Sequence, residues 1–232
     1  MRQPQACASP HAGRNGLITR QKAQEEANNK QRAFSHPRYS NLVAELTVAR
    51  PDQVWVADIT YIRLRHGFVY LAVILDVYTR AIRGWHVGRS LDLSLTLSAL
   101  RQALSKGTPE IHHSDLGIQY SAPAYIDVLR AAGADISMAE VGQPTQNGYA
   151  ERVIRTIKEE EVDLSDYQDY HQARQQIKKF LEEVCNKKRI HSALGYLTPI
   201  EFENQWNKQN RSQSSLTKAV FVSKKWGALQ HF

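Results

Sequence analysis

The 232-residue sequence predicts a mixed α/β fold, in which three antiparallel strands precede an alternation of helices and strands. Three β-rich runs are separated by only two residues each. Breaks this short join neighbouring strands as antiparallel hairpins, because a parallel return needs a dozen or more residues. Helical segments then separate the later short strands, which indicates parallel pairing there. The predicted sheet is therefore mixed and flanked by helices.

The three β-rich runs are Val54–Leu64, Gly67–Val77 and Arg80–Val87. The middle run contains eight consecutive apolar residues, Phe68 to Leu75. A strand that is apolar on both faces is expected to be covered on both sides. Eight apolar residues are too few to cross a bilayer, and no membrane partner is expected.

Helical periodicity begins with leucines at positions 93, 97, 100 and 104, and Gly107 with Pro109 ends that helix. The segments expected next are a strand near Glu110–His113, a helix over about Pro123–Ala132, a strand over Ala134–Met138 and a helix over about Thr145–Val162. Tyr170–Cys185 carries an apolar stripe on one helical face, so it is expected to pack on the core. Thr198, Pro199 and Glu201 form a capping box that starts a last helix.

Charge divides the chain into three parts. The net charge of +7 is the sum of +5 over residues 1–50, −4 over 51–185 and +6 over 186–232. We expect a basic, poorly ordered arm over 1–50, in which Arg20–Phe34 could form a polar helix, a core over 51–204 and a basic tail over 205–232. The basic ends could bind phosphate or could simply be solvated.

The cysteine count and the first sixteen residues narrow the class of protein further. Two cysteines, Cys7 and Cys185, cannot build a disulfide framework or a four-cysteine zinc site. The first sixteen residues contain no apolar segment typical of a secretory signal. A reducing, cytoplasmic setting is therefore expected.

Two aspartates stand in positions where an acid needs an explanation. Asp58 lies inside the first predicted strand, where an unpartnered acid is costly. It could be paired with an arginine or belong to a site. Asp115 follows the fourth predicted strand, at the kind of sheet edge where ligands bind, although an Asx turn or N-cap also fits.

A third acid, Glu151, lies on the first turns of the helix predicted over Thr145–Val162, where the helix dipole alone favours Glu. Lys158 follows seven residues later, about 20° off the same face and roughly 10 Å along the axis. This pair suits a metal with a phosphate chain passing it, or a solvated helix face. Three ionised acids brought together require cations, and carboxylate oxygens select hard ions such as Mg²⁺.

The three acids and the sequence motifs around them resemble insertion-sequence transposases of the "IS three" kind, whose catalytic core is similar to that of retroviral integrases. Asp58, Asp115 and Glu151, with 35 residues between the last two, resemble the DDE triad of that family. The motifs that carry this resemblance are Trp55-x-x-Asp58-Ile-Thr-Tyr-Ile62, His113-Ser-Asp-x-Gly-x-Gln-Tyr120, Ser137-Met138, Asn147 to Glu151, and Asn186 to Phe202. They agree in order over about residues 51–202.

This resemblance implies a ribonuclease H-like core and a DDE transposase, a polynucleotidyl transferase. Such an enzyme cleaves transposon DNA ends with water in a Mg²⁺-dependent step, and the freed 3′-hydroxyl then attacks target DNA. By the same resemblance, Asp58, Asp115 and Glu151 would hold two Mg²⁺ ions, which Mn²⁺ could replace. Lys158, with Arg155 and Arg152 on the same helix, would contact DNA. A homo-oligomer on DNA, in a bacterial cytoplasm and associated with the nucleoid, is expected.

Other readings of the sequence stay open at this point. The chain could be an inactive or truncated DNA-binding remnant, because residues 1–50 do not resemble the helix-turn-helix segments found upstream in such transposases. It could also be a ribonuclease H-like nuclease that cuts without joining. A serine-hydrolase reading of His113, Ser114 and Asp115 fails, because adjacent residues of an extended segment point to opposite sides. A zinc site at His112 and His113 is disfavoured, because no further ligand stands at suitable spacing.

Overall fold

The computed structural model describes residues 39–140 and 142–210 and confirms the predicted fold class. A single five-stranded mixed sheet has the strand order β3-β2-β1-β4-β5. The elements are β1 (Val54–Arg63), β2 (Phe68–Asp76), β3 (Ile82–Gly88), α2 (Leu93–Leu104), β4 (Ile111–Ser114), α3 (Pro123–Ala131), β5 (Asp135–Met138), α4 (Gly148–Ile157) and α5 (Tyr170–Lys179). No helix in the described ranges is long and apolar enough to span a bilayer.

The sheet changes from antiparallel to parallel at β1. β1 and β3 both pair with β2 in antiparallel register, as the short breaks between them require. On its other side β1 pairs in parallel with β4, and β4 pairs in parallel with β5. Each parallel connection contains a helix, α2 before β4 and α3 before β5, as a parallel crossover requires.

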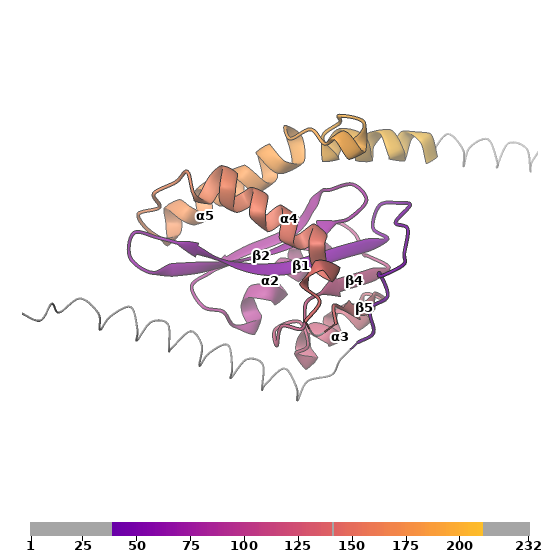
Figure 1. Cartoon of the computed structure of the whole chain (residues 1–232), viewed down its shortest axis with the longest axis horizontal. Helices are drawn as coiled ribbons and strands as arrows, with labels where there is room; N and C mark the ends of the chain where they lie inside the picture. The colour runs from indigo at the N-terminus through magenta and orange to yellow at the C-terminus, as the bar shows by residue number, and fades with distance from the viewer. Residues whose placement is uncertain (1–38, 141, 211–232) are drawn as a thin grey trace, which may run out of the picture.

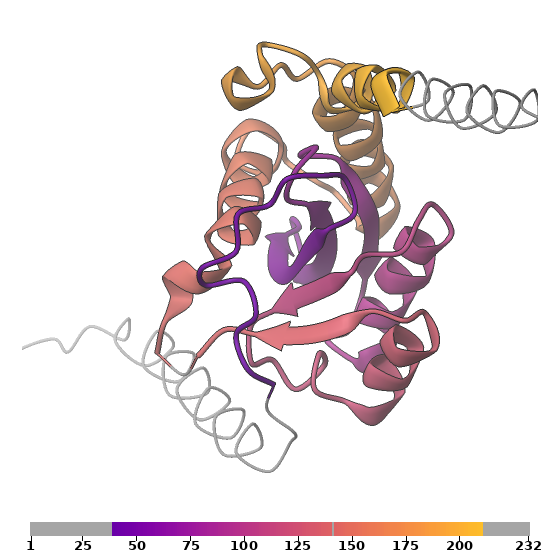
Figure 2. The ribbon, with the colours of Figure 1, turned by 90° about the vertical axis from the view of Figure 1, so that its right-hand side faces the viewer.

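Helices cover both faces of the sheet (Figures 1 and 2). Side chains of β1 alternate between the two resulting cores. Val54, Val56 and Ile62 belong to the core under α4 and α5, whereas Trp55 and Ala57 belong to the core under α2 and α3. Because Asp58 continues the even-numbered series, its side chain lies on the same face as α4.

Close packing of α2 on β3 requires a glycine in the strand. A Cβ atom built on Gly84 would lie 2.2 Å from the carbonyl oxygen of Ala99 in α2. No side chain fits at that distance, so any substitution would push the helix away from the sheet. The helix predicted from the leucine spacing is confirmed, but its buried face is centred on Leu95, Ala99, Leu100 and Ala103. Of the four predicted leucines, only Leu100 is buried, and Leu93, Leu97 and Leu104 are partly buried at the edge of that core.

The helix predicted over about Thr145–Val162 is confirmed in its extent, but it is not a uniform α-helix. The structure has a 3₁₀ turn over Pro144–Asn147, then α4, then a π-helical turn over Lys158–Val162. The helix predicted over Tyr170–Cys185 likewise consists of α5 and a π-helical turn over Phe180–Cys185. π-turns are rare and often accompany functional sites, and no composition signal marks them.

Residues 39–50 pack on the core, although the sequence suggested an arm that extends to residue 50. Val43, Leu46 and Val48 contact the core under α4 and α5, and the Leu42 amide donates a 2.8 Å hydrogen bond to Ser137 Oγ. The last described helix covers residues 199–210 and so runs past the predicted boundary at 204. The rest of the arm, including Arg20–Phe34, and residues 211–232 lie outside the described residues.

A buried ionic network fastens this last helix to the sheet. The Arg83 guanidinium lies 2.9 Å from both Asp52 and Asp76 and 2.8 Å from Glu203, which belongs to the helix over residues 199–210. The Asp76 side chain is fully buried and also accepts hydrogen bonds from the amides of Asp52, Tyr78 and Thr79. This one carboxylate therefore organises both the turn after β2 and the attachment of the C-terminal helix.

We expect Asp76→Ala to lower the free energy of unfolding by about 3–5 kcal/mol, because it leaves the buried Arg83 without its main partner. Urea unfolding followed by circular dichroism measures this loss. Glu203→Ala, which removes a more exposed partner, serves as the matched control and should cost much less. Equal losses in the two variants would contradict the central role of Asp76.

Candidate active site

The parallel pairing of β1 with β4 sets Asp58 beside Asp115. The last residue pair of that ladder joins Ala57 to Ser114. The next residue on each strand is an aspartate, and neighbouring strands lie about 4.8 Å apart. Two acids 57 positions apart in the sequence are thus held at one point by strand register.

Local hydrogen bonds orient both carboxylates. Asp58 Oδ1 accepts the Ile59 amide at 2.7 Å, and Asp115 Oδ1 accepts the Gly117 amide at 2.9 Å. A Cβ atom at position 117 would lie 2.9 Å from Asp115 Oδ1, so a larger residue there would displace this carboxylate. Asp58 is half-buried and Asp115 is exposed, so the pair opens to solvent at the carboxyl end of β4.

Helix α4 and the π-helical turn that follows it bring Glu151 and Lys158 to the same place. The charges of Asp115 and Glu151 both raise the pKa of Asp58, whereas the charge of Lys158 lowers it. The Lys158 ammonium also lies 4.4 Å from the centre of the ring of Tyr61, which is three residues beyond Asp58 on β1. The three acids and Lys158 therefore share one electrostatic neighbourhood.

The pKa of Asp58 is raised to about 7, first by burial and then by the negative charge of Asp115. Although Asp115 as a whole residue is exposed, the protein around its carboxyl desolvates that group and raises its pKa, against the opposing effect of the Gly117 hydrogen bond. An acid whose pKa stands well above its ordinary value is typical of a functional site, because its surroundings make it keep a proton that it would release in water.

The donor set suits a divalent cation. Carboxylate oxygens are the ligands that Mg²⁺ prefers, and a cation between the acids would oppose the repulsion that raises the pKa of Asp58. In residues 39–140 and 142–210, however, no three His, Cys, Asp or Glu side chains are close enough to hold one ion as they are oriented. The acids are electrostatically coupled, and sharing an ion requires their side chains to approach further.

Three residues of the transposase-like motifs have structural roles that the sequence did not reveal. Asn147 Nδ2 donates a 3.1 Å hydrogen bond to the carbonyl of Ala57, which ties the start of α4 to the strand position next to Asp58. His113 Nδ1 lies 2.8 Å from Ser137 Oγ and so joins β4 to β5. Burial raises the pKa of the Tyr120 hydroxyl, and the negative charges of Asp115 and Asp58 add to this rise.

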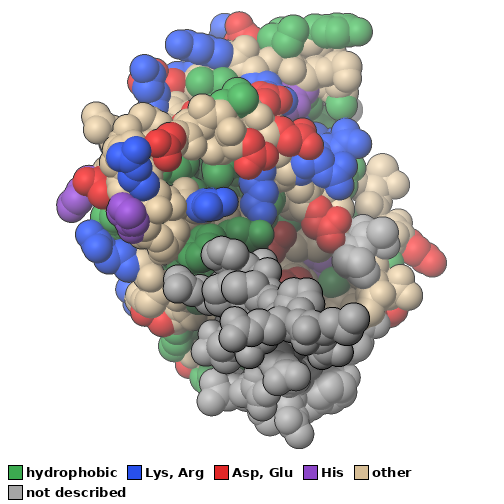
Figure 3. Space-filling model, turned by 60° about the vertical axis from the view of Figure 1, so that its left-hand side comes forward, with side chains coloured by type: hydrophobic (Ala, Val, Ile, Leu, Met, Phe, Trp, Pro, Cys, Tyr) green, Lys and Arg blue, Asp and Glu red, His purple; other side chains and the backbone are tan. Residues whose placement is uncertain are grey.

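The arginines predicted to act with Lys158 lie elsewhere on α4. Arg152 and Arg155 line a large neighbouring cleft, whereas Lys158 lies over Tyr61 beside the acids. On the face shown in Figure 3, basic and acidic side chains are interspersed and form no broad single-sign patch. Any anion bound here would therefore depend on local cations.

Two integrase core domain families match the chain, one over residues 48–144 and the other over residues 132–199. Together the matched segments contain Asp58, Asp115 and Glu151. The fold and the matched families place the chain in the class of proteins that carry an integrase catalytic core.

Among curated proteins, the chain is 36% identical over 179 residues to the transposase of insertion sequence IS904 from Lactococcus lactis, covering 76% of this chain and 70% of that protein. It is 34% identical to the IS629 transposase of Shigella sonnei, over 70% of this chain and 55% of that one. It is 32% identical to the InsF transposase of IS3fB from Escherichia coli, over 75% and 62% respectively. The chain thus matches less than two thirds of the last two relatives. It belongs to the insertion-sequence transposase family with an integrase core.

Solved structures show the same fold at low sequence identity. The HTLV-2 integrase catalytic core domain, solved in complex with magnesium in a trimeric form, is 20% identical with a TM-score of 0.55, covering 66% of this chain and 97% of that one. A chain of a simian T-cell lymphotropic virus intasome has a TM-score of 0.58 at 16% identity, covering 72% and 59%. The likeness confirms the ribonuclease H-like architecture.

The raised pKa of Asp58 predicts a pH dependence of stability. Between the unfolded pKa of 3.8 and the folded value of about 7, the folded state binds the extra proton, so stability falls as pH rises through this window. We expect Asp58→Asn, which mimics the protonated form, to raise the melting temperature more at pH 8 than at pH 4. Differential scanning calorimetry at both values measures this, and an equal shift at both would contradict the raised pKa.

Proposed function

We propose that this chain is the catalytic part of a DDE transposase, with Asp58, Asp115 and Glu151 as its metal-binding acids. In the proposed reaction, water attacks the phosphorus at a transposon end, the bond to the 3′-oxygen breaks and a 3′-hydroxyl is freed. That hydroxyl then attacks a phosphodiester of target DNA and displaces its 3′-oxygen. One phosphodiester bond is broken and one is formed in the second step, so it needs no further energy source.

The observation that carries this proposal is the electrostatic coupling of Asp58 with Asp115, Glu151 and Lys158, from three separate elements of an integrase core. Divalent ions bound by the three carboxylates would activate the attacking oxygen and stabilise the leaving one. Asp58 and Asp115 lie side by side through strand register, and Glu151 approaches from α4. The chain itself therefore supplies the position of the negative charge, and Asn147 fixes the start of α4 against β1.

DNA is the partner that this chemistry requires. Lys158 lies near enough to the acids for its charge to lower the pKa of Asp58, and its ammonium would neutralise one backbone charge of DNA bound there. The HTLV-2 integrase catalytic core domain has been solved in a trimeric and in a dimeric form. We expect this transposase to act as an oligomer assembled on DNA, in the bacterial cytoplasm.

Substituting the acids tests the catalytic assignment. We expect Asp58→Asn, Asp115→Asn and Glu151→Gln each to lower Mg²⁺-dependent strand cleavage by at least a thousandfold, because each removes a negative ligand without changing side-chain size. Cleavage and joining are scored with labelled transposon-end DNA on a gel. DNA binding by the variants should persist.

The control for this experiment is Asp127→Asn, which removes a carboxylate from the exposed side of α3 and should leave cleavage unchanged. Cleavage retained in all three acid variants would rule out the proposed site. Nicked but never joined product would favour a nuclease that cuts without strand transfer, and no product from the unaltered chain would favour a DNA-binding remnant.

Lys158→Ala should weaken DNA binding about tenfold near 0.1 M salt and reduce the slope of log K against log salt by about 0.9, the loss expected for one duplex phosphate contact. Fluorescence anisotropy over a salt series measures both quantities. Lys178→Ala on α5 is the matched control, with the same loss of charge. An unchanged salt slope for Lys158→Ala would show that this ammonium does not contact phosphate.

A further inference from the structure

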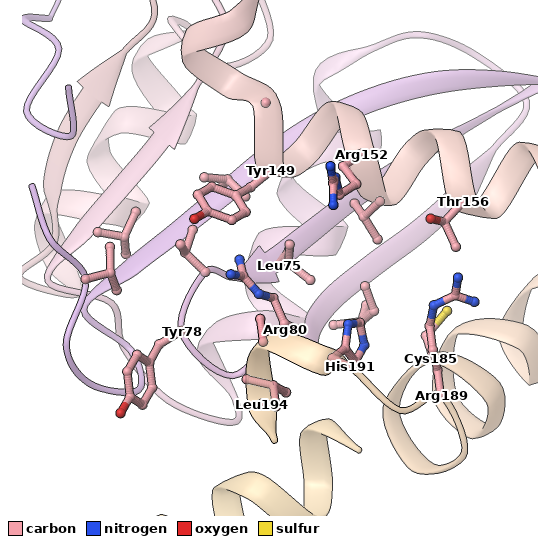
Figure 4. A pocket seen from close by; sticks show the side chains of 18 of the residues that line it. Leu75, Tyr78, Arg80, Tyr149, Arg152, Thr156, Cys185, Arg189, His191 and Leu194 are labelled. Carbon is pink, nitrogen blue, oxygen red and sulfur yellow. The ribbon is translucent and has the colours of Figure 1, made fainter. Parts of the chain in front are cut away.

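A second feature lies on the same face of the sheet as the acids, and the proposed reaction leaves it unexplained. A cleft of about 1300 Å³ opens between α4, the ends of β1 and β2, and the C-terminal segment 189–194. We call it the α4 cleft. Figure 4 shows Tyr149, Arg152 and Thr156 on its α4 side, and Arg189, His191 and Leu194 on its C-terminal side.

Arg80 reaches into the α4 cleft from the turn between β2 and β3 (Figure 4). Its backbone is left-handed, with φ of 63°, and its amide donates a 2.9 Å hydrogen bond to the Asp76 carbonyl. A left-handed conformation costs energy in a residue other than glycine, and such strain concentrates at functional sites. The turn anchored by Asp76 therefore holds Arg80 in a conformation that an unconstrained chain would avoid.

The Arg80 guanidinium lacks an acceptor for one of its nitrogens. Its carbon lies 4.3 Å from the centre of the Tyr149 ring, so one face of the group is stacked on an aromatic side chain. Its Nη1 is buried, and no described residue accepts a hydrogen bond from it. Leaving a buried charged donor without an acceptor is costly, and a bound anion would remove that cost.

Among the charged residues that line the cleft, the positive ones predominate. Glu160 is occupied by Arg189 in an ion pair. This leaves Arg80, Arg152 and Arg155 facing a single further acid, Glu159. Within the described ranges none of these three arginines forms an ion pair with a carboxylate. The charges of Arg189 and Arg80 also help to lower the pKa of His191, as expected where the local potential is positive.

The combination favours a nucleic acid over an acidic protein segment. Tyr149 is 47% exposed, and an arginine stacked on an exposed tyrosine is the kind of platform on which nucleobases stack. Planar guanidinium groups match phosphate geometry. The cleft also borders Asn147 and Gly148, at the start of the helix that carries Glu151. The cleft therefore adjoins the helix face that carries Glu151.

We propose that the α4 cleft binds the sugar-phosphate backbone of a DNA strand engaged at the carboxylate site, with Arg80 and Arg152 contacting phosphates and Tyr149 offering a stacking surface. This inference rests on the proposed function, since it assigns a second contact region to the same substrate. It also gives a role to the Arg189-x-His191 segment, which forms the wall opposite α4. Arg80 is a binding residue here and does not touch the reacting phosphorus.

The test uses the full chain and short labelled DNA, both single-stranded and duplex, in buffer with a chelator so that no cleavage occurs. We expect Arg80→Gln and Arg152→Gln each to weaken binding about tenfold near 0.1 M salt. Each should also reduce the salt slope by about 0.7 for single strands or 0.9 for duplex. Arg80→Lys, which keeps the charge, should recover part of the affinity. Arg101→Gln, an exposed arginine on α2 at the opposite face, is the charge-matched control and should change neither quantity.

A photo-crosslinking amino acid in place of Thr156, which lines the cleft, identifies the occupant. Crosslinks to the labelled DNA support the proposal. Crosslinks only to a second copy of the chain, or binding by Arg80→Gln and Arg152→Gln that equals that of Arg101→Gln, would overturn it. Should Arg80→Gln fail to unfold cooperatively, Arg152→Gln and the crosslink decide the outcome.

The failure of this inference can be told from the failure of the proposed function. If the acid variants lose cleavage while Arg80→Gln binds DNA normally, the catalytic site stands and the α4 cleft does not bind DNA. If the acid variants keep cleavage while Arg80→Gln loses affinity, the cleft binds DNA and the catalytic assignment is wrong.

Discussion

The fold holds two carboxylates that repel each other, Asp58 and Asp115, on neighbouring strands. Two unit negative charges about 4 Å apart repel by roughly 4 kcal/mol at an effective dielectric of 20. Burial raises the pKa of Asp58 most, and the neighbouring charge of Asp115 raises it further. A fold that only needed stability would separate these groups. Their placement on neighbouring strands is what a site for cations would require, and it agrees with the function proposed above.

The rest of the fold holds the acids against that repulsion. Parallel pairing of β1 with β4 fixes Asp58 beside Asp115, and this pairing exists because α2 provides the crossover between the antiparallel and parallel parts of the sheet. Asn147 fixes the start of α4, so Glu151 arrives one helical turn later. The Arg83 network then fastens the C-terminal helix to the sheet, which completes the cleft on the far flank of α4.

Much of this arrangement could be predicted from the sequence, for reasons of length and period. The two-residue breaks allowed only hairpins, and the leucine spacing of α2 allowed only a helix. The three acids were identifiable because the sequence motifs around them resemble those of insertion-sequence transposases. The α/π junction at Lys158 was not predictable, because Lys158–Val162 has the composition of an ordinary helix. Neither was the stacking of Arg80 on Tyr149, which joins a hairpin turn to a helix 69 residues later with no periodic signal.

Locating divalent ions in a crystal of this chain grown with Mn²⁺ tests the proposed metal site most directly, because the anomalous scattering of Mn²⁺ identifies the metal independently of the protein. We expect anomalous peaks in contact with oxygens of Asp58 and Asp115, with Glu151 turned inward to reach one of them. Peaks confined to other parts of the molecule at saturating Mn²⁺, with the three carboxylates still apart, would contradict it.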